Sequence, residues 1–246
     1  SAQKRVELQN FQQRKRLLEY DDVMNQQREV IYSLRLFALE KGEELKAEAR
    51  RMIASALDHA VAKFLEDAEG PEQWDRDGLK SALTMQFLVS ADPITDPKAT
   101  PTMDRLVAAV RAEGEASFQR KVEYLKSFGA TIGLPGVDQQ VLSQVLLGVI
   151  DEKWKDHLYD LDLLRNAIQY RAYGQKDPLV EYKKEAFEMF EDLMRDLRAS
   201  FADRYLKVQV SAEPPQAPPP SPSRGPRGSP PPPRGGTDDL FADGAA

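Results

Sequence analysis

The first 41 residues contain no glycine and no proline, and no other feature constrains the fold as strongly. Apolar side chains recur there at alternate spacings of three and four, which is the stripe of an amphipathic helix. The stripe consists of Leu17, Tyr20, Met24, Gln27, Ile31, Leu34 and Ala38, with Gln27 its single polar member, and Val23, Val30 and Phe37 widen it. At about 1.5 Å per residue, such a helix of about 38 residues is about 57 Å long, which suits a spine against which other units pack.

Turn residues divide the following hundred residues into further helices. Gly42 and Gly70-Pro71 bound an amphipathic helix over residues 43–65. A short helix is expected around 77–87, followed by a loop of three Asp-Pro or Thr-Pro pairs. Thr102 then caps a helix that runs towards Phe128.

A second long stripe begins at Val137, after a break at Gly129–Gly136. Its members are Leu146, Ile150, Trp154, His157, Leu161, Leu164 and Ile168. Tyr170–Lys176 interrupts it, and Asp177-Pro178 starts another helix because Asp accepts free N–H groups and Pro fits the first turn. Two helices that each carry an apolar stripe and are joined by about eight residues are expected to fold back as an antiparallel hairpin. No convincing strand pattern occurs, so we expect an all-α fold.

The sequence from Ser211 onward differs from the rest. Of the 17 prolines, 11 fall between Pro214 and Pro233, among serine, glycine and arginine. With almost no apolar side chains, this tail cannot offset the entropy of ordering, and we expect it to be disordered and partly polyproline II. Its acidic end carries one apolar pair, Leu240-Phe241, which could be a docking motif, although composition favours a solubilising tail.

Composition excludes several classes of protein. The 40 acidic residues exceed the 34 basic ones, whereas a dedicated nucleic-acid binder shows a basic excess. The absence of cysteine excludes thiolate zinc sites and disulfides. The longest apolar run, 145–150, is far shorter than the ~18–20 residues that cross a bilayer. The chain starts without Met or an apolar leader, directly on helical sequence, so we expect it to be a piece of a longer protein.

No constellation of reactive side chains emerges. The sequence Gly174-Gln175-Lys176-Asp177 lacks the leading glycine and the hydroxyl residue of a phosphate loop. His59 and His157 lie in separate helices, and His157 falls on an apolar seam, which favours a hydrogen-bonded core histidine over a ligand or base. Asp21 and Asp22 point about 100° apart on a helix, which favours a solvated or ion-paired face over a catalytic pair. We therefore assign no catalytic, cofactor-binding or metal-binding residue.

Three blocks of residues, spread over positions 2 to about 210, carry a family resemblance. The first block comprises Ala2-Gln3-Lys4, Val6-Glu7, Asn10-Phe11, Arg14-Lys15, Leu17-Leu18-Glu19-Tyr20-Asp21-Asp22-Val23, Asn25, Gln27-Arg28 and Ile31-Tyr32. The second comprises Trp154-Lys155-Asp156-His157-Leu158, Leu164-Arg165, Ile168, Arg171, Tyr173-Gly174-Gln175-Lys176-Asp177-Pro178, Glu181-Tyr182, Phe187 and Met189-Phe190, and a weaker one Trp74-Asp75, Gly78-Leu79, Leu83 and Phe87. The first block resembles the scaffold helix of the SecA family, the ATP-driven motors of bacterial preprotein secretion. The second resembles that family's two-helix finger, and the weaker one its helical wing. All three stand in the family's order and spacing.

The resemblance implies a division of the chain into four parts. Residues 1–41 would form the scaffold helix, 42–135 the helical wing, 136–210 the finger and the end of the scaffold, and 211–246 the tail. The family's nucleotide-binding domains, which hold ATP and Mg, precede this segment, so the chain alone should have no cofactor and no ATPase activity. The zinc module that ends many members is excluded here by the lack of cysteine.

The resemblance also implies a function and partners. The spine would carry nucleotide-driven movement from the motor domains to the finger, which meets secretory preproteins at the mouth of the SecYEG channel. Tyr173, Arg171 and Lys176 would form the fingertip, with Tyr173 contacting the moving polypeptide; alternatively, Tyr173 tucks against Tyr170 or the base of the hairpin. A homodimer and an anionic membrane surface are further implied partners, and the implied location is the cytoplasmic face of the bacterial plasma membrane.

Two other readings compete with the translocase segment. A free-standing helical adaptor that binds a partner protein would have the same spine, wing and hairpin. A nucleic-acid-binding coiled coil would need a basic face. The densest basic run, Arg14-Lys15-Arg16, is followed within two turns by Glu19, Asp21 and Asp22, so we expect no nucleic-acid partner.

Overall fold

The computed structural model describes residues 2–40, 42–65, 70–91, 96, 98, 100, 102–171 and 177–211. The chain divides into two units, Ser1–Val210 and Ser211–Ala246. The tail predicted to be disordered lies outside the described residues, apart from Ser211.

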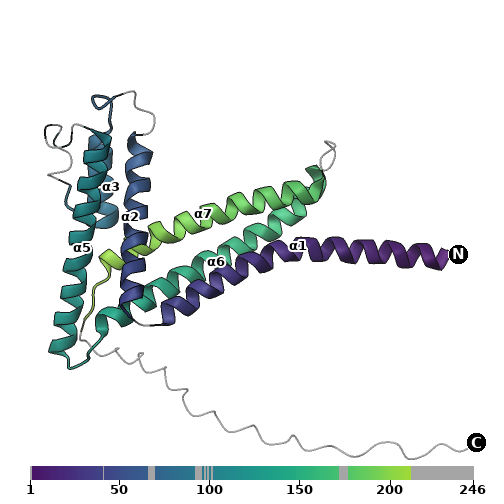
Figure 1. Cartoon of the computed structure of the whole chain (residues 1–246), viewed down its shortest axis with the longest axis horizontal. Helices are drawn as coiled ribbons and strands as arrows, with labels where there is room; N and C mark the ends of the chain where they lie inside the picture. The colour runs from purple at the N-terminus through teal and green to yellow at the C-terminus, as the bar shows by residue number, and fades with distance from the viewer. Residues whose placement is uncertain are drawn as a thin grey trace, which may run out of the picture. The chain divides into compact units, whose positions relative to one another are not determined.

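Three long helices make up one part of the first unit: α1 (Ala2–Leu39), α6 (Val137–Arg171) and α7 (Pro178–Lys207) (Figure 1). α6 and α7 pack against each other as an antiparallel hairpin, and α1 packs against both. The predicted spine helix and hairpin are therefore confirmed. The predicted end of α6 is wrong by two residues, because Tyr170 and Arg171, neither of them a helix breaker, continue the helix.

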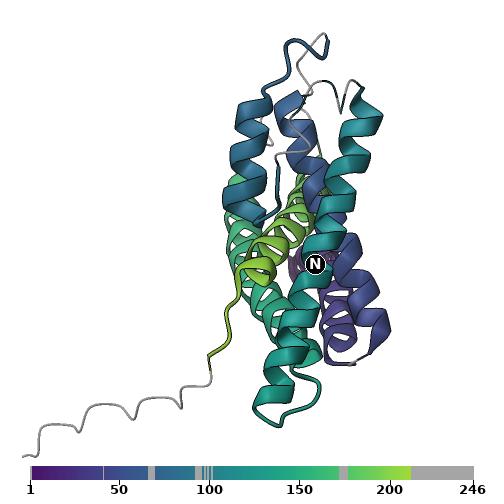
Figure 2. The ribbon, with the colours of Figure 1, turned by 90° about the vertical axis from the view of Figure 1, so that its left-hand side faces the viewer.

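The other helices of the described residues are α2 (Glu43–Leu65), α3 (Arg76–Phe87) and α5 (Met103–Thr131), which run alongside one another (Figure 2). α2 contacts α3, α5 and α7. Thr102 caps α5 as predicted, its hydroxyl accepting a hydrogen bond from Arg105 N. The predicted break at Gly129 starts too early: α5 continues to Thr131, because Gly129 adopts the helical conformation and the next proline is Pro135. Gly129 has no room for a side chain, since an added Cβ would lie 2.6 Å from Leu134 O. No described residue lies in a strand, so the described fold is all-α.

Two apolar clusters hold this unit together. The larger combines the C-terminal part of α1, helices α2, α3 and α5, the start of α6 and the end of α7. The smaller lies within the hairpin and consists of Leu161, Leu164, Ile168, Tyr182 and Ala186, with Tyr20, Val23, Met24 and Met189 packed against it. α7 contributes to both clusters, as its predicted stripe requires.

The stripe predicted for α1 is buried only in its second half. Ile31 and Ala38 are fully buried, whereas Leu17 is 49 % exposed and Val30, which widens the stripe, is also exposed. The apolar contacts of α1 with the hairpin begin at Tyr20, and the first turns of α1 extend past them (Figure 1). Among the described residues, no helix is long and apolar enough to cross a membrane.

Candidate functional site at the hairpin of α6 and α7

The described residues frame the hairpin connection on both sides. Arg171 is the last residue of α6, although its side chain lies outside the description. Asp177 caps α7: its carboxylate accepts a hydrogen bond from Leu179 N at 3.0 Å, and Pro178 occupies the first turn, as predicted. Tyr173 and Lys176, the other two predicted fingertip residues, lie outside the described residues. The fingertip therefore stays a prediction.

Near this connection, α1 is joined to both helices of the hairpin. The rings of Tyr20 in α1 and Tyr182 in α7 meet edge to face, with centroids 4.8 Å apart. Arg165 of α6 donates a hydrogen bond to Asp21 at 3.1 Å and lies over the Tyr20 ring. Burial raises the pKa of Tyr182. Asp21 is thus ion-paired and Asp22 is exposed, which agrees with the predicted solvated or ion-paired face.

A buried polar bridge joins α1 to the hairpin about two turns further along. Gln27 is 7 % exposed and His157 is 5 % exposed. The side-chain amide of Gln27 donates to Ala186 O at 2.9 Å, and its oxygen lies 2.8 Å from His157 Nε2. Because that oxygen is an acceptor, the proton of the neutral imidazole is assigned to Nε2. The predicted hydrogen-bonded seam histidine is confirmed.

The environment of His157 favours its neutral form. Burial lowers the pKa of His157, and the nearby Asp160 carboxylate opposes that shift without cancelling it. The Trp154 and Phe190 rings lie close to His157, with centroids 5.6 and 5.8 Å from that of the imidazole. A neutral, enclosed and hydrogen-bonded imidazole is suited to holding helices together rather than to transferring protons.

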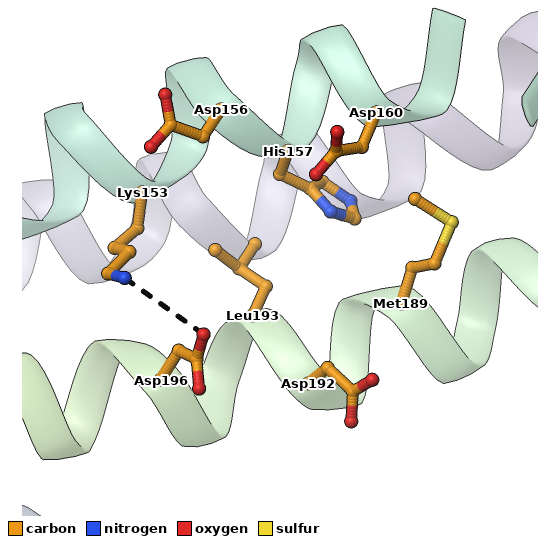
Figure 3. A pocket seen from close by; sticks show the side chains of 8 residues that line it. All are labelled: Lys153, Asp156, His157, Asp160, Met189, Asp192, Leu193 and Asp196. Carbon is orange, nitrogen blue, oxygen red and sulfur yellow. Dashed lines mark ion pairs between the residues drawn. The ribbon is translucent and has the colours of Figure 1, made fainter. Parts of the chain in front are cut away.

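An acidic groove follows the seam between α6 and α7 (Figure 3). Its lining residues are Lys153, Asp156, His157 and Asp160 of α6, and Met189, Asp192, Leu193 and Asp196 of α7. Lys153 reaches across to Asp196 at 3.9 Å. No group of three potential ligands among the described residues could hold a metal ion. The sequence signal for this groove is the spacing of four between the aspartates of each helix.

The contacts described at the hairpin hold three helices together. Aromatic contact, an ion pair and a buried amide bridge fix one long helix to an antiparallel hairpin. These features define the class: a helical scaffold segment.

The chain belongs to the SecA family. The profile of the family described as "SecA Wing and Scaffold domain" matches residues 1–209. The chain is 36 % identical over 214 residues to the protein translocase subunit SecA of Syntrophomonas wolfei, covering 87 % of this chain and 25 % of that protein. It is 37 % identical to SecA 1 of Mycolicibacterium smegmatis (90 % and 24 %) and 39 % identical to SecA of Saccharopolyspora erythraea (86 % and 22 %). The chain thus spans about a quarter of the length of these relatives.

These matches favour the segment of a translocase subunit over the free-standing adaptor. They cover the described body in a single stretch and agree with the three blocks of the sequence analysis.

Proposed function

We propose that this chain is the wing and scaffold segment of a preprotein translocase subunit and that it transmits movement rather than performing chemistry. α1 carries nucleotide-driven displacement from motor domains outside this segment to the α6–α7 hairpin. The hairpin acts on secretory preproteins at the SecYEG channel. ATP and Mg belong to the motor domains and not to this chain.

The observation that carries this proposal is the attachment of α1 to both helices of the hairpin. Tyr20 contacts Tyr182 of α7, Asp21 pairs with Arg165 of α6, and Gln27 bonds to both helices. A helix attached at several points along its length cannot slide or tilt without moving the hairpin, because packed interiors transmit displacement rather than absorb it.

The hairpin connection is the proposed point of contact with the polypeptide. Tyr173 offers an aromatic ring that can grip any sequence through apolar and backbone contact, and Arg171 and Lys176 face channel loops. The Asp177 cap and the end of α6 at Arg171 support this role, since they provide a firm base on either side of the connection.

The remaining assignments follow from the family. Residues 1–41 are the scaffold helix, 42–135 the wing, 136–210 the finger with the end of the scaffold, and 211–246 the tail. The complete protein acts at the cytoplasmic face of the bacterial plasma membrane, with anionic lipid and a second copy of itself as further partners and no nucleic acid.

Substitution of Tyr173 in the complete translocase subunit tests the proposal. We expect Tyr173→Ala to reduce preprotein transport sharply while ATP binding and helicity stay unchanged, and Tyr173→Phe to retain much of the transport. Tyr159→Ala is the matched control, because Tyr159 is a residue of α6 that is 65 % exposed and lies twelve positions before Arg171, away from the connection. Normal transport by Tyr173→Ala, or an equal loss in both alanine variants, contradicts the proposed role of the connection.

A further inference from the structure

The two long apolar stripes of this chain each contain one polar member, and these two residues meet. In α1 the exception is Gln27, and in α6 it is His157. They are 130 positions apart in the sequence, yet Gln27 Oε1 lies 2.8 Å from His157 Nε2 inside the packed seam. A buried polar residue at one place in an apolar seam has a known use, which is to specify how two helices align.

The hydrogen bonds of Gln27 can form in one axial position of α1 only. Its oxygen needs His157, and its amide nitrogen needs the backbone oxygen of Ala186 in α7. Ala186 is fully buried, and its small side chain lets α1 approach α7 closely enough for this hydrogen bond. Both ends of one amide are therefore satisfied together, by two different helices.

The apolar contacts of α1, in contrast, tolerate displacement. Its stripe repeats at three and four residues, so a shift by one helical turn, about 5.4 Å, places one apolar side chain where the next one was. Such one-turn displacements between packed helices are a known form of structural switching. After a shift towards the smaller cluster, Gln27 would face the apolar side chains of Leu161 and Leu164 without its partners.

The position of the bridge supports a role in alignment. On one side of it, Phe190 and Trp154 pack against the larger apolar cluster. On the other side, Met189 and Met24 pack against the smaller one. The bridge therefore lies where the two clusters adjoin, and it ties the alignment of one to that of the other.

We propose that Gln27 and His157 are positioning residues that specify the axial register of α1 on the α6–α7 hairpin. They select one of several apolar alignments that packing alone would permit. In the proposed translocase, this selection would make a displacement of α1 reach the hairpin in full instead of being lost as slippage. That consequence rests on the proposed function, whereas the register itself does not.

Distance measurements between spin labels test the register directly. Because the chain has no cysteine, labels can be placed at Glu29→Cys in α1 and Lys184→Cys in α7, both exposed positions, and read by pulsed electron paramagnetic resonance. We expect a single narrow distance in the unsubstituted chain and a broadened or second distance in Gln27→Leu, because a shift of α1 by one turn moves its label about 5.4 Å along the helix axis. Gln26→Leu is the matched control: the same change at the neighbouring, exposed position should leave the distance narrow.

A second variant separates alignment from stability. Gln27→Leu with His157→Leu removes both polar groups, so its melting temperature should return to or exceed that of the unsubstituted chain. Its label distance should nevertheless stay broad. A single narrow, unshifted distance in this double variant overturns the inference, whatever the stability of Gln27→Leu alone.

Preprotein transport by the complete subunit is the last measurement of this test. We expect Gln27→Leu to transport less preprotein per ATP hydrolysed than Gln26→Leu. A broadened distance together with normal transport supports the register inference and contradicts the proposed function, so the two fail separately.

Discussion

Lys46 of α2 forms a buried ion pair whose loss should be among the most damaging single changes in the described body. Its side chain is 7 % exposed and lies 3.1 Å from the carboxylate of Asp138, itself 6 % exposed, in the first turn of α6. Lys46 also donates a hydrogen bond to the carboxylate of Glu43 at 2.8 Å. Lys46→Met keeps the length and apolar body of the side chain but leaves Asp138 buried without its cation.

The expected cost follows from that burial. Removing one member of a buried ion pair destabilises a protein by about 3–5 kcal/mol, whereas replacing both by apolar residues is often neutral or stabilising. For a body of this size the single change should lower the melting temperature by about 6–20 °C. Lys46→Met with Asp138→Leu should recover most of that loss.

Urea unfolding followed by far-ultraviolet circular dichroism measures these differences. Lys63→Met, an exposed position on the same helix, is the control and should stay within about 0.5 kcal/mol of the unsubstituted chain. A cost below about 1 kcal/mol for Lys46→Met, or a double variant as unstable as the single one, would refute the reasoning.

The ion pair of Lys46 and Asp138 also predicts that the stability of the fold depends on pH in the alkaline range. Burial by itself lowers the pKa of Lys46, but the hydrogen bonds and charges of Glu43 and Asp138 outweigh it and leave the pKa above its ordinary value of 10.5. The stabilisation is therefore complete below pH 10.5 and is lost as the pH rises through the folded-state pKa. A titration of unfolding free energy between neutral and strongly alkaline pH should show this loss, and Lys46→Met with Asp138→Leu should lack it.

Three further predictions concern packing and protonation. Tyr205 is fully buried and its hydroxyl has no hydrogen-bond partner among the described residues, so Tyr205→Phe should be neutral or stabilise the fold by about 1 kcal/mol in urea unfolding. Burial lowers the pKa of His157 from 6.5, so stability should fall as the pH drops below 6.5, where the unfolded chain takes up the proton first; His157→Gln should flatten that slope in thermal melts. Gly114→Ala should cost about 1–3 kcal/mol because its Cβ would lie 2.3 Å from Leu57 Cδ1, whereas Gly148→Ala, with open space around it, should stabilise α6 by about 0.5–1 kcal/mol.

The helices themselves were predictable because their signals are local. Spacings of three and four locate the apolar faces, and Thr102 and Asp177 mark helix starts through hydrogen bonds to nearby N–H groups. The end of α6 was less predictable, since no glycine or proline marks the boundary at Arg171. The exposure of Leu17 was not predictable, because a stripe shows that a face is apolar but not how far along the helix its neighbours reach.

The contacts of the candidate site could be identified only from the fold. His157 was predicted as a hydrogen-bonded seam residue from its apolar neighbours, but its partner Gln27 lies 130 positions away, beyond any local pattern. Both residues stand out in the sequence as the polar exceptions of their stripes, which is the signal that could have paired them. The acidic groove depends on how α6 and α7 face each other, and no spacing within one helix fixes that.

Site-specific photo-crosslinking tests most directly whether the hairpin connection touches the preprotein as it moves. A photoreactive aromatic amino acid would replace Tyr173 in the complete translocase subunit, or Tyr159 as the control on the exposed face of α6. With a preprotein arrested midway through the channel, we predict crosslinks to the preprotein from position 173 and far weaker ones from position 159. Crosslinks of equal strength from both positions, or from position 159 alone, would contradict the account.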